Sequence, residues 1–283
     1  FNWQDYTVHD KVHPNKAGAE KMATVWFEAL KKVLASSETV FSPEIVRYKT
    51  LEDGDSLALH IFKPRNMQAG EKRPAIVYFF GGGWKLGTPI QFYRECAYYA
   101  SKGMVAVSVD YRIGYLHHST PFESFEDAKD AICWLRSHAS DYQLDPDKIA
   151  VAGGSAGGHL AAALGTIGSD ETVPAGYRPN LSVLYYPVID MVSRGYGFPE
   201  IKRDFEKISP IHHVSEATPS TLILLGTKDP IVSVETIEAY QDKLLQKGVD
   251  CELHLFEGAG HPIFLYRKPL TEEYYKVRKL TDD

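Results

Sequence analysis

The chain has 283 residues, of which 44% are hydrophobic and 24% charged, and its formal net charge at pH 7 is −6. These values are ordinary for a globular protein, and the length suits one large α/β domain or one domain with an appendage. The mild negative charge, without a run of Lys or Arg, argues against nucleic-acid binding, and no apolar run reaches transmembrane length. Cys96, Cys133 and Cys251 lie far apart without a CxxC pair. We therefore expect buried thiols and no metal or cofactor.

The first segment, residues 1–37, contains an acid and a base close together. Asp10 and His13 stand three residues apart, just before a run from Lys16 to Leu34 whose pattern predicts one amphipathic helix. No serine precedes the pair. A histidine base needs a nucleophile to serve, so we expect His13 to do no chemistry in this chain.

From residue 44 onward, short apolar runs alternate with helical patterns. Residues 44–50 and 57–62 predict an opening pair of strands joined by the turn sequence EDGD. Further strands are predicted at 74–80, 104–110, 148–153, 181–187, 221–227 and 251–256, and helices at 125–139, 156–165 and 234–248. This alternation predicts a mostly parallel sheet with helices on both faces. Ligands bind such sheets at the carboxyl ends of the strands.

The sequence VAGGSAGGHL contains a G-x-S-x-G motif made of Gly153, Ser155 and Gly157. It lies directly after a predicted buried strand and directly before a predicted helix, which is the context that a nucleophile elbow requires. A dinucleotide-binding loop is the other interpretation of so many glycines. That fingerprint needs an acidic residue at the end of the next strand, where YYP stands instead.

A nucleophilic serine needs oxyanion donors, a base and an acid, and the ends of three further predicted strands offer candidates for them. Three glycines after the strand at 74–80 allow backbone amides to turn inward, so Gly82, Gly83 and Ala156 are the predicted oxyanion donors. Trp84 is the expected anchor of this loop. His261 follows the last strand and is the predicted base.

The acid has two candidates. Asp229 follows the strand at 221–227 in a turn that Pro230 restricts, and Asp190 follows the preceding strand. Asp229 is preferred because Ser155, Asp229 and His261 stand in the chain order in which an acid and a histidine usually follow a nucleophile elbow.

Together, GGGW (81–84), DYR (110–112), GGSAGG (153–158), GTKDPIV (226–232) and GAGH (258–261) resemble the α/β-hydrolase superfamily. Within it, residues 38–283 resemble the group of acetyl esterases, hormone-sensitive-lipase-like enzymes and bacterial feruloyl-esterase-like proteins. Many relatives have a histidine before the three glycines. Phe80 stands there and cannot hydrogen-bond through its side chain, so the oxyanion loop must be supported differently. The segment between Asp190 and Pro210 implies a short cap and a small acyl group.

The resemblance implies a metal-free and cofactor-free serine esterase with a Ser155–His261–Asp229 triad. The expected substrate is a small ester or acylated oligosaccharide, above all an acetyl ester of a plant polysaccharide such as acetylated xylan. A feruloyl esterase, a general carboxylesterase and a peptidase of the same fold are the enzymatic alternatives. A catalytically dead binding module is the non-enzymatic one.

The segment DKVHPNKAGAEKMATVWFEAL resembles the closing block of SGNH/GDSL esterases, in which Asp and His precede a final helix. Residues 1–37 are therefore expected to be the remnant of a preceding SGNH-type esterase domain in a longer, secreted or periplasmic protein. An ordinary N-terminal helix with a chance match is the alternative.

Overall fold

The computed structural model describes residues 42–168, 176–191, 201, 204–263 and 279–281, and from Pro43 onward they belong to a compact unit spanning Pro43–Asp283. The N-terminal segment with Asp10 and His13 lies outside the described residues. So does most of the segment predicted to form a short cap, of which Met191, Ile201 and the stretch from Asp204 onward are described. Among the described helices, none combines the length and apolar character needed to cross a bilayer.

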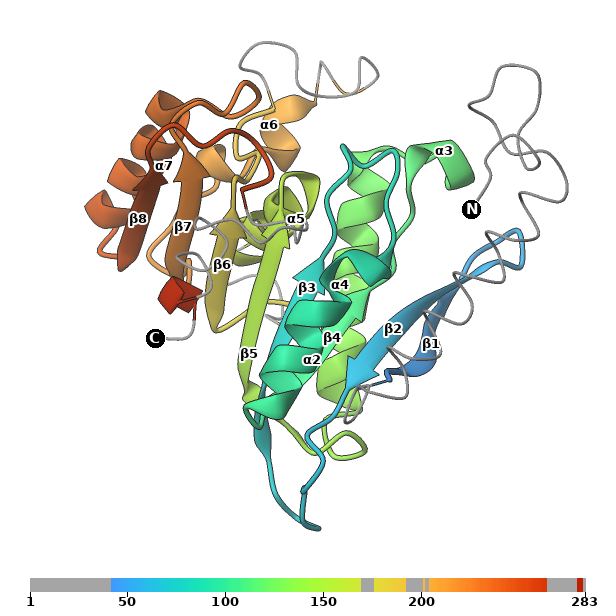
Figure 1. The fold of residues 1–283 in the computed structure, drawn as a ribbon. Helices are drawn as coiled ribbons and strands as arrows, with labels where there is room; N and C mark the ends of the chain where they lie inside the picture. The colour runs from blue at the N-terminus through green and yellow to red at the C-terminus, as the bar shows by residue number, and fades with distance from the viewer. Residues whose placement is uncertain (1–41, 169–175, 192–200, 202–203, 264–278, 282–283) are drawn as a thin grey trace, which may run out of the picture. The chain divides into compact units, whose positions relative to one another are not determined.

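The centre of the unit is an eight-stranded sheet with the order β1-β2-β4-β3-β5-β6-β7-β8 (Figure 1). The first two pairings, β1 with β2 and β2 with β4, are antiparallel, and all the others are parallel. The strands are β1 Glu44–Thr50, β2 Ser56–Phe62, β3 Arg73–Phe79, β4 Val105–Val109, β5 Leu144–Gly154, β6 Leu181–Tyr185, β7 Ser220–Gly226 and β8 Cys251–Phe256. All eight strands predicted from the sequence are present, with ends that differ by a few residues.

Helices cover both faces of this sheet. Helix α2 packs against β3 and β4 on one face, and α4 and α5 lie on the other (Figure 1). The described helices are α2 Tyr93–Ser101, α3 Gly114–His117, α4 Pro121–Ser137, α5 Ala156–Thr166, α6 Phe205–Ile208 and α7 Val234–Gln246, with short 3-10 helices η2 Pro89–Phe92 and η5 Pro210–His212. The predicted mostly parallel sheet with helices on both faces is confirmed.

Helix α4 begins four residues before the predicted start. Pro121 occupies its first turn, and Thr120 and Glu123 form a reciprocal capping box. Proline favours the first helical position because its missing N–H has no intrahelical acceptor there, and the box satisfies two further N–H groups. These local signals, rather than the apolar periodicity, determine the residue at which the helix begins.

The core is formed by the apolar central strands, since β4 is buried throughout and β3 from Ala75 onward. Trp84, the expected loop anchor, is only 1% exposed. The expectation of buried thiols is right for Cys96 and wrong for Cys133, which lies on the exposed side of α4, while Cys251 is half-buried.

Candidate active site

The carboxyl ends of β5, β7 and β8 bring three predicted site residues into one hydrogen-bonded chain. Ser155 follows β5, Asp229 follows β7 and His261 follows β8. The Ser155 hydroxyl donates to Nε2 of His261 at 3.0 Å, and Nδ1 of His261 donates to Oδ2 of Asp229 at 2.7 Å. The tautomer that these two bonds require leaves Nε2 as the acceptor of the serine proton.

Ser155 occupies the tight turn between β5 and α5. Its backbone has φ +55° and ψ −118°, a conformation that costs an L-residue roughly 1–3 kcal/mol. The flanking glycines permit this turn, because a Cβ on Gly157 would lie 2.0 Å from the carbonyl oxygen of Phe79. A Cβ on Gly153 would likewise lie 2.3 Å from the oxygen of Gly157. The glycines of the motif therefore allow a close approach of two backbone segments beneath the serine.

Asp229 is held by the turn that contains it. Its Oδ1 accepts hydrogen bonds from the backbone N–H groups of Ile231 at 2.8 Å and Val232 at 3.0 Å. Its side chain is fully buried, and among the described residues Oδ2 accepts a hydrogen bond from His261 alone. The structure thus brings Asp229 to the histidine, whereas Asp190 makes no described contact with it.

His261 is largely packed and is oriented by an aromatic neighbour. Its side chain is 14% exposed, and its ring meets that of Tyr186 edge to face at 4.6 Å. None of the other histidines that the structure describes makes a side-chain hydrogen bond to Ser155. They are bonded elsewhere or exposed, and they are His60, His117, His118, His138, His159, His212, His213 and His254.

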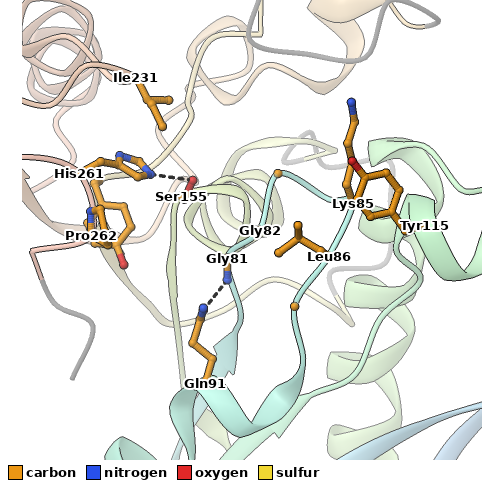
Figure 2. Close-up of a pocket in the computed structure, with 13 residues that line it drawn as sticks. Gly81, Gly82, Lys85, Leu86, Gln91, Tyr115, Ser155, Ile231, His261 and Pro262 are labelled. Atoms are coloured by element: carbon orange, nitrogen blue, oxygen red, sulfur yellow. Dashed lines mark hydrogen bonds between the residues drawn. The ribbon is translucent and has the colours of Figure 1, made fainter. Parts of the chain in front are cut away.

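The predicted oxyanion loop lies on the other side of Ser155 from His261, as Figure 2 shows. Gly82 and Gly83 line the pocket, with φ of +139° and +62°. A Cβ on Gly82 would lie 1.9 Å from the carbonyl oxygen of Leu86, so no other residue fits there. Within the described part of the chain, the N–H groups of Gly82 and Gly83 have no protein acceptor. Ala156 begins α5, where the N–H has no intrahelical partner.

Ser155, His261 and the three glycines Gly81–Gly83 line a pocket of about 440 Å³. Figure 2 shows Ser155 and His261 at one end and Lys85 and Tyr115 at the other. The lining is completed by the glycine loop and by apolar and polar side chains that the sequence did not indicate: Leu86, Gln91, Tyr186, Ile231 and Pro262. Ile231 lies within the motif GTKDPIV, but nothing in that motif marks it as a pocket residue, and the set as a whole converges from separate loops.

This arrangement can perform acyl transfer. It combines a hydroxyl nucleophile, a base bonded to it, an acid that orients the base, and backbone N–H groups beside the nucleophile. The N-terminus of α5 adds a favourable potential for negative charge developing near Ser155. In the part of the chain that the structure describes, no group of three or more His, Cys, Asp or Glu side chains is placed to hold a metal ion.

Comparison with known proteins places this geometry among esterases. The family model BD-FAE matches residues 59–203. The structure is similar to that of a thermophilic esterase from Thermogutta terrifontis, Est2, with a TM-score of 0.78 and 36% sequence identity, covering 85% of this chain and 90% of that one. The same esterase has also been solved with propionate and with butyrate bound.

Two curated relatives are more distant. Esterase LipC of Mycobacterium tuberculosis is 28% identical over 241 residues, which cover 74% of this chain and 57% of LipC. An acetylxylan esterase of Xylanibacter ruminicola is 26% identical over 227 residues, which cover 75% of this chain and 44% of that enzyme. The chain spans about half the length of the curated relatives it matches.

Proposed function

This chain belongs to the BD-FAE family and to the α/β-hydrolase serine esterases, and from that premise we propose that it hydrolyses short-chain acyl esters of plant polysaccharides or their oligosaccharides, above all acetyl esters. The observation that carries the esterase activity is the hydrogen-bonded chain from Ser155 through His261 to Asp229 at the pocket wall. The proposed preference for an acetyl group and for a carbohydrate depends on the pocket residues that would contact the substrate.

In the proposed mechanism, the Oγ of Ser155 attacks the ester carbonyl carbon while Nε2 of His261 takes the hydroxyl proton. The carbonyl oxygen becomes an oxyanion and accepts hydrogen bonds from the N–H groups of Gly82, Gly83 and Ala156. His261 then protonates the departing alcohol oxygen, and Asp229 stabilises the imidazolium in between. Water repeats the sequence on the acyl-enzyme and releases the carboxylic acid.

The end of the pocket near Tyr115 supports a sugar as the alcohol part of the substrate. Tyr115 is 73% exposed and Leu86 is 53% exposed, although both line the pocket. An exposed aromatic ring beside a catalytic pocket offers its flat face to the apolar face of a sugar ring. The similarity to an acetylxylan esterase, and to an esterase solved with small acids bound, agrees with a short acyl group on such a sugar.

Residues 1–37 enter this proposal as the end of an upstream SGNH-type esterase domain, fused to a catalytic domain at 38–283. Two esterases on one chain would suit the removal of several acyl decorations from the same polymer.

Acetate release from acetylated xylo-oligosaccharides tests the proposal, with p-nitrophenyl acetate as the simple substrate. Ser155→Ala should lower both rates by several orders of magnitude, because it removes the nucleophile. Tyr115→Ala should lower kcat/KM for the oligosaccharide roughly tenfold, which corresponds to about 1.4 kcal/mol of lost binding, and leave aryl acetate hydrolysis nearly unchanged.

Three results would change the assignment. Cleavage of aryl acetates without acetate release from the oligosaccharide would keep the esterase and discard acetylated xylan, so that feruloyl and other esters come next. Equal loss on both substrates in Tyr115→Ala would remove the sugar-stacking role. Failure of a fluorophosphonate probe to label Ser155 would favour a catalytically dead binding module.

A further inference from the structure

A single peptide group, the one joining Phe80 to Gly81, is held by side chains at both of its polar atoms. Its carbonyl oxygen accepts a hydrogen bond from the hydroxyl of Tyr111 at 2.7 Å, and its N–H donates to Oε1 of Gln91 at 2.6 Å. In a trans peptide these two atoms point in opposite directions. The two bonds therefore fix the orientation of the whole peptide plane where β3 ends and the oxyanion loop begins.

Tyr111 is positioned by burial and stacking. It follows β4, is fully buried, and stacks on the ring of Phe80 with 4.1 Å between centroids and 15° between planes. Burial raises the pKa of its hydroxyl well above the usual value, so the group stays a donor. Phe80 thus contributes a stacking surface at the position where many relatives have a histidine.

Gln91 approaches the same peptide from η2, a segment that is itself anchored. The carbonyl oxygen of Pro89 accepts a buried hydrogen bond from Ser108 at 2.7 Å, and the ring of Phe92 stacks on Tyr78 at 4.8 Å. The backbone on both sides of Gln91 is therefore fixed to the core. Its side chain lines the pocket and reaches Gly81, as Figure 2 shows.

The loop that follows has little stiffness of its own. Gly81, Gly82 and Gly83 are consecutive, and glycine has the widest choice of backbone conformations. A rotation of the peptide before Gly81 would turn the next N–H groups away from Ser155. Oxyanion donors are effective only when they are oriented before the reaction, because reorientation during the reaction costs free energy.

We propose that Gln91 and Tyr111 form a clamp on the Phe80–Gly81 peptide that pre-orients the N–H groups of Gly82 and Gly83 for the oxyanion. Both are positioning residues, and the inference depends on the acyl-transfer mechanism proposed above. Neither residue touches the reacting atoms in this assignment. The clamp supplies the support that Phe80 cannot give through its own side chain.

The test compares Gln91→Met and Tyr111→Phe, which keep side-chain volume and remove one clamp bond each. We expect each to lower kcat for p-nitrophenyl acetate roughly tenfold with KM changed less than about threefold, a smaller loss than the 10²–10³-fold seen when an oxyanion donor is removed outright. Binding of an aryl trifluoromethyl ketone should weaken in parallel with kcat/KM, because its adduct with Ser155 carries the same oxyanion. Fluorophosphonate labelling counts active sites in every variant.

A matched control is Tyr99→Phe, which removes another tyrosine hydroxyl bond to a backbone carbonyl, that of Thr281, at 2.9 Å. Tyr99 does not line the pocket, so its loss should lower thermal stability and leave kcat and ketone affinity within about twofold of the parent, as expected for an interaction that is not strengthened in the transition state. This variant separates a general loss of packing from a loss of oxyanion orientation.

Gln91→Glu adds a pH readout that tests whether the side chain at this position lies beside the oxyanion. Both the protonated and the ionised carboxyl group can accept the hydrogen bond from Gly81, but the ionised form places negative charge beside the oxyanion. The activity of Gln91→Glu relative to the parent chain should therefore rise as pH falls, and that of Gln91→Met should stay constant.

If the parent chain is active and both Gln91→Met and Tyr111→Phe stay within twofold of its activity, the clamp proposal is overturned and the esterase assignment remains. Equal losses in Gln91→Met and Tyr99→Phe would lead to the same conclusion. A parent chain without esterase activity would instead remove the proposed function on which the clamp depends.

Discussion

Asp229 uses its two carboxylate oxygens for different tasks. Oδ1 accepts hydrogen bonds from the N–H groups of Ile231 and Val232 and so closes the turn after β7. Oδ2 accepts a hydrogen bond from Nδ1 of His261. The first task holds the side chain in one rotamer, and the second selects the histidine tautomer. A carboxylate fixed in this way can stabilise a transient imidazolium without moving.

Asp229→Asn should separate these tasks. The amide oxygen can still accept the turn N–H groups, but the amide NH₂ facing His261 favours the wrong tautomer. We expect kcat to fall about 10³–10⁴-fold at neutral pH with little change in melting temperature. Asp190→Asn is the matched control, and a comparable loss of kcat in that variant would return Asp190 to the role of the acid.

At the scale of elements, the strand–turn–helix unit of β5 and α5 depends on backbones in direct contact. Gly157 lies in the first turn of α5, and a Cβ there would come within 2.5 Å of the carbonyl oxygens of both Phe79 and Phe80. Helix α5, which Ser155 precedes, is therefore packed against the end of β3, where the predicted oxyanion loop begins. The same contact places Ser155 beside its predicted N–H donors.

Gly157→Ala should lower the free energy of unfolding by about 3 kcal/mol, the upper end of the usual range for overpacked buried sites, and should remove most of the activity. Gly248→Ala is the comparison, because Gly248 has φ +74° and open space where a Cβ would lie. Gly248→Ala should lower the free energy of unfolding only by the cost of a left-handed conformation for alanine, about 1–2 kcal/mol. Denaturant unfolding of both variants measures the difference, and equal stability of the two would contradict the close-packing argument.

At the scale of the whole molecule, α5 is tied to the segment before η5 by a buried histidine. Nε2 of His159 donates to the carbonyl oxygen of Ile208 at 2.7 Å, and the ring of Trp84 meets it edge to face at 5.0 Å. His159 is completely buried, and this desolvation lowers its pKa to about 4. The neutral imidazole of His159 on α5 therefore contacts both the loop that contains Trp84 and the end of α6.

This pKa makes the stability depend on pH. Above about pH 6.5, the usual pKa of histidine, His159 is neutral in both states, and as pH falls toward 4 only the unfolded chain takes up the proton. The contribution lost between about pH 7.5 and pH 5 is about 2 kcal/mol by linkage. Asp110, whose pKa is raised by burial to about 6, has the opposite sign, because its folded form takes up a proton first and gains stability as pH falls through 6.

His159→Gln isolates the histidine from the aspartate. The amide can still donate to Ile208 but does not titrate, so the stability difference between this variant and the parent should change by about 2 kcal/mol between about pH 7.5 and pH 5. Urea unfolding at the two pH values measures the change. A constant difference would mean that His159 titrates alike in the folded and unfolded chain.

The fold class could be predicted from the sequence, and so could Ser155 and His261 as the candidate nucleophile and base. Hydrophobic runs and helical periods are local properties, and the elbow glycines and His261 stand at strand ends that can be located without a structure. For the same reason Gly82, Gly83 and Ala156 could be named, since each is adjacent to a recognisable motif.

Contacts between residues of separate segments could be identified only in the folded structure, because they form where those segments meet in space. The fold brought Asp229 rather than Asp190 to His261, and it placed Gln91 and Tyr111 on opposite sides of one peptide. No spacing rule relates these residues, because their proximity follows from the strand order and from the anchoring of loops to the core. Hydrogen-bond partners of this kind are specified by the packed fold, and periodicity along the chain does not record them.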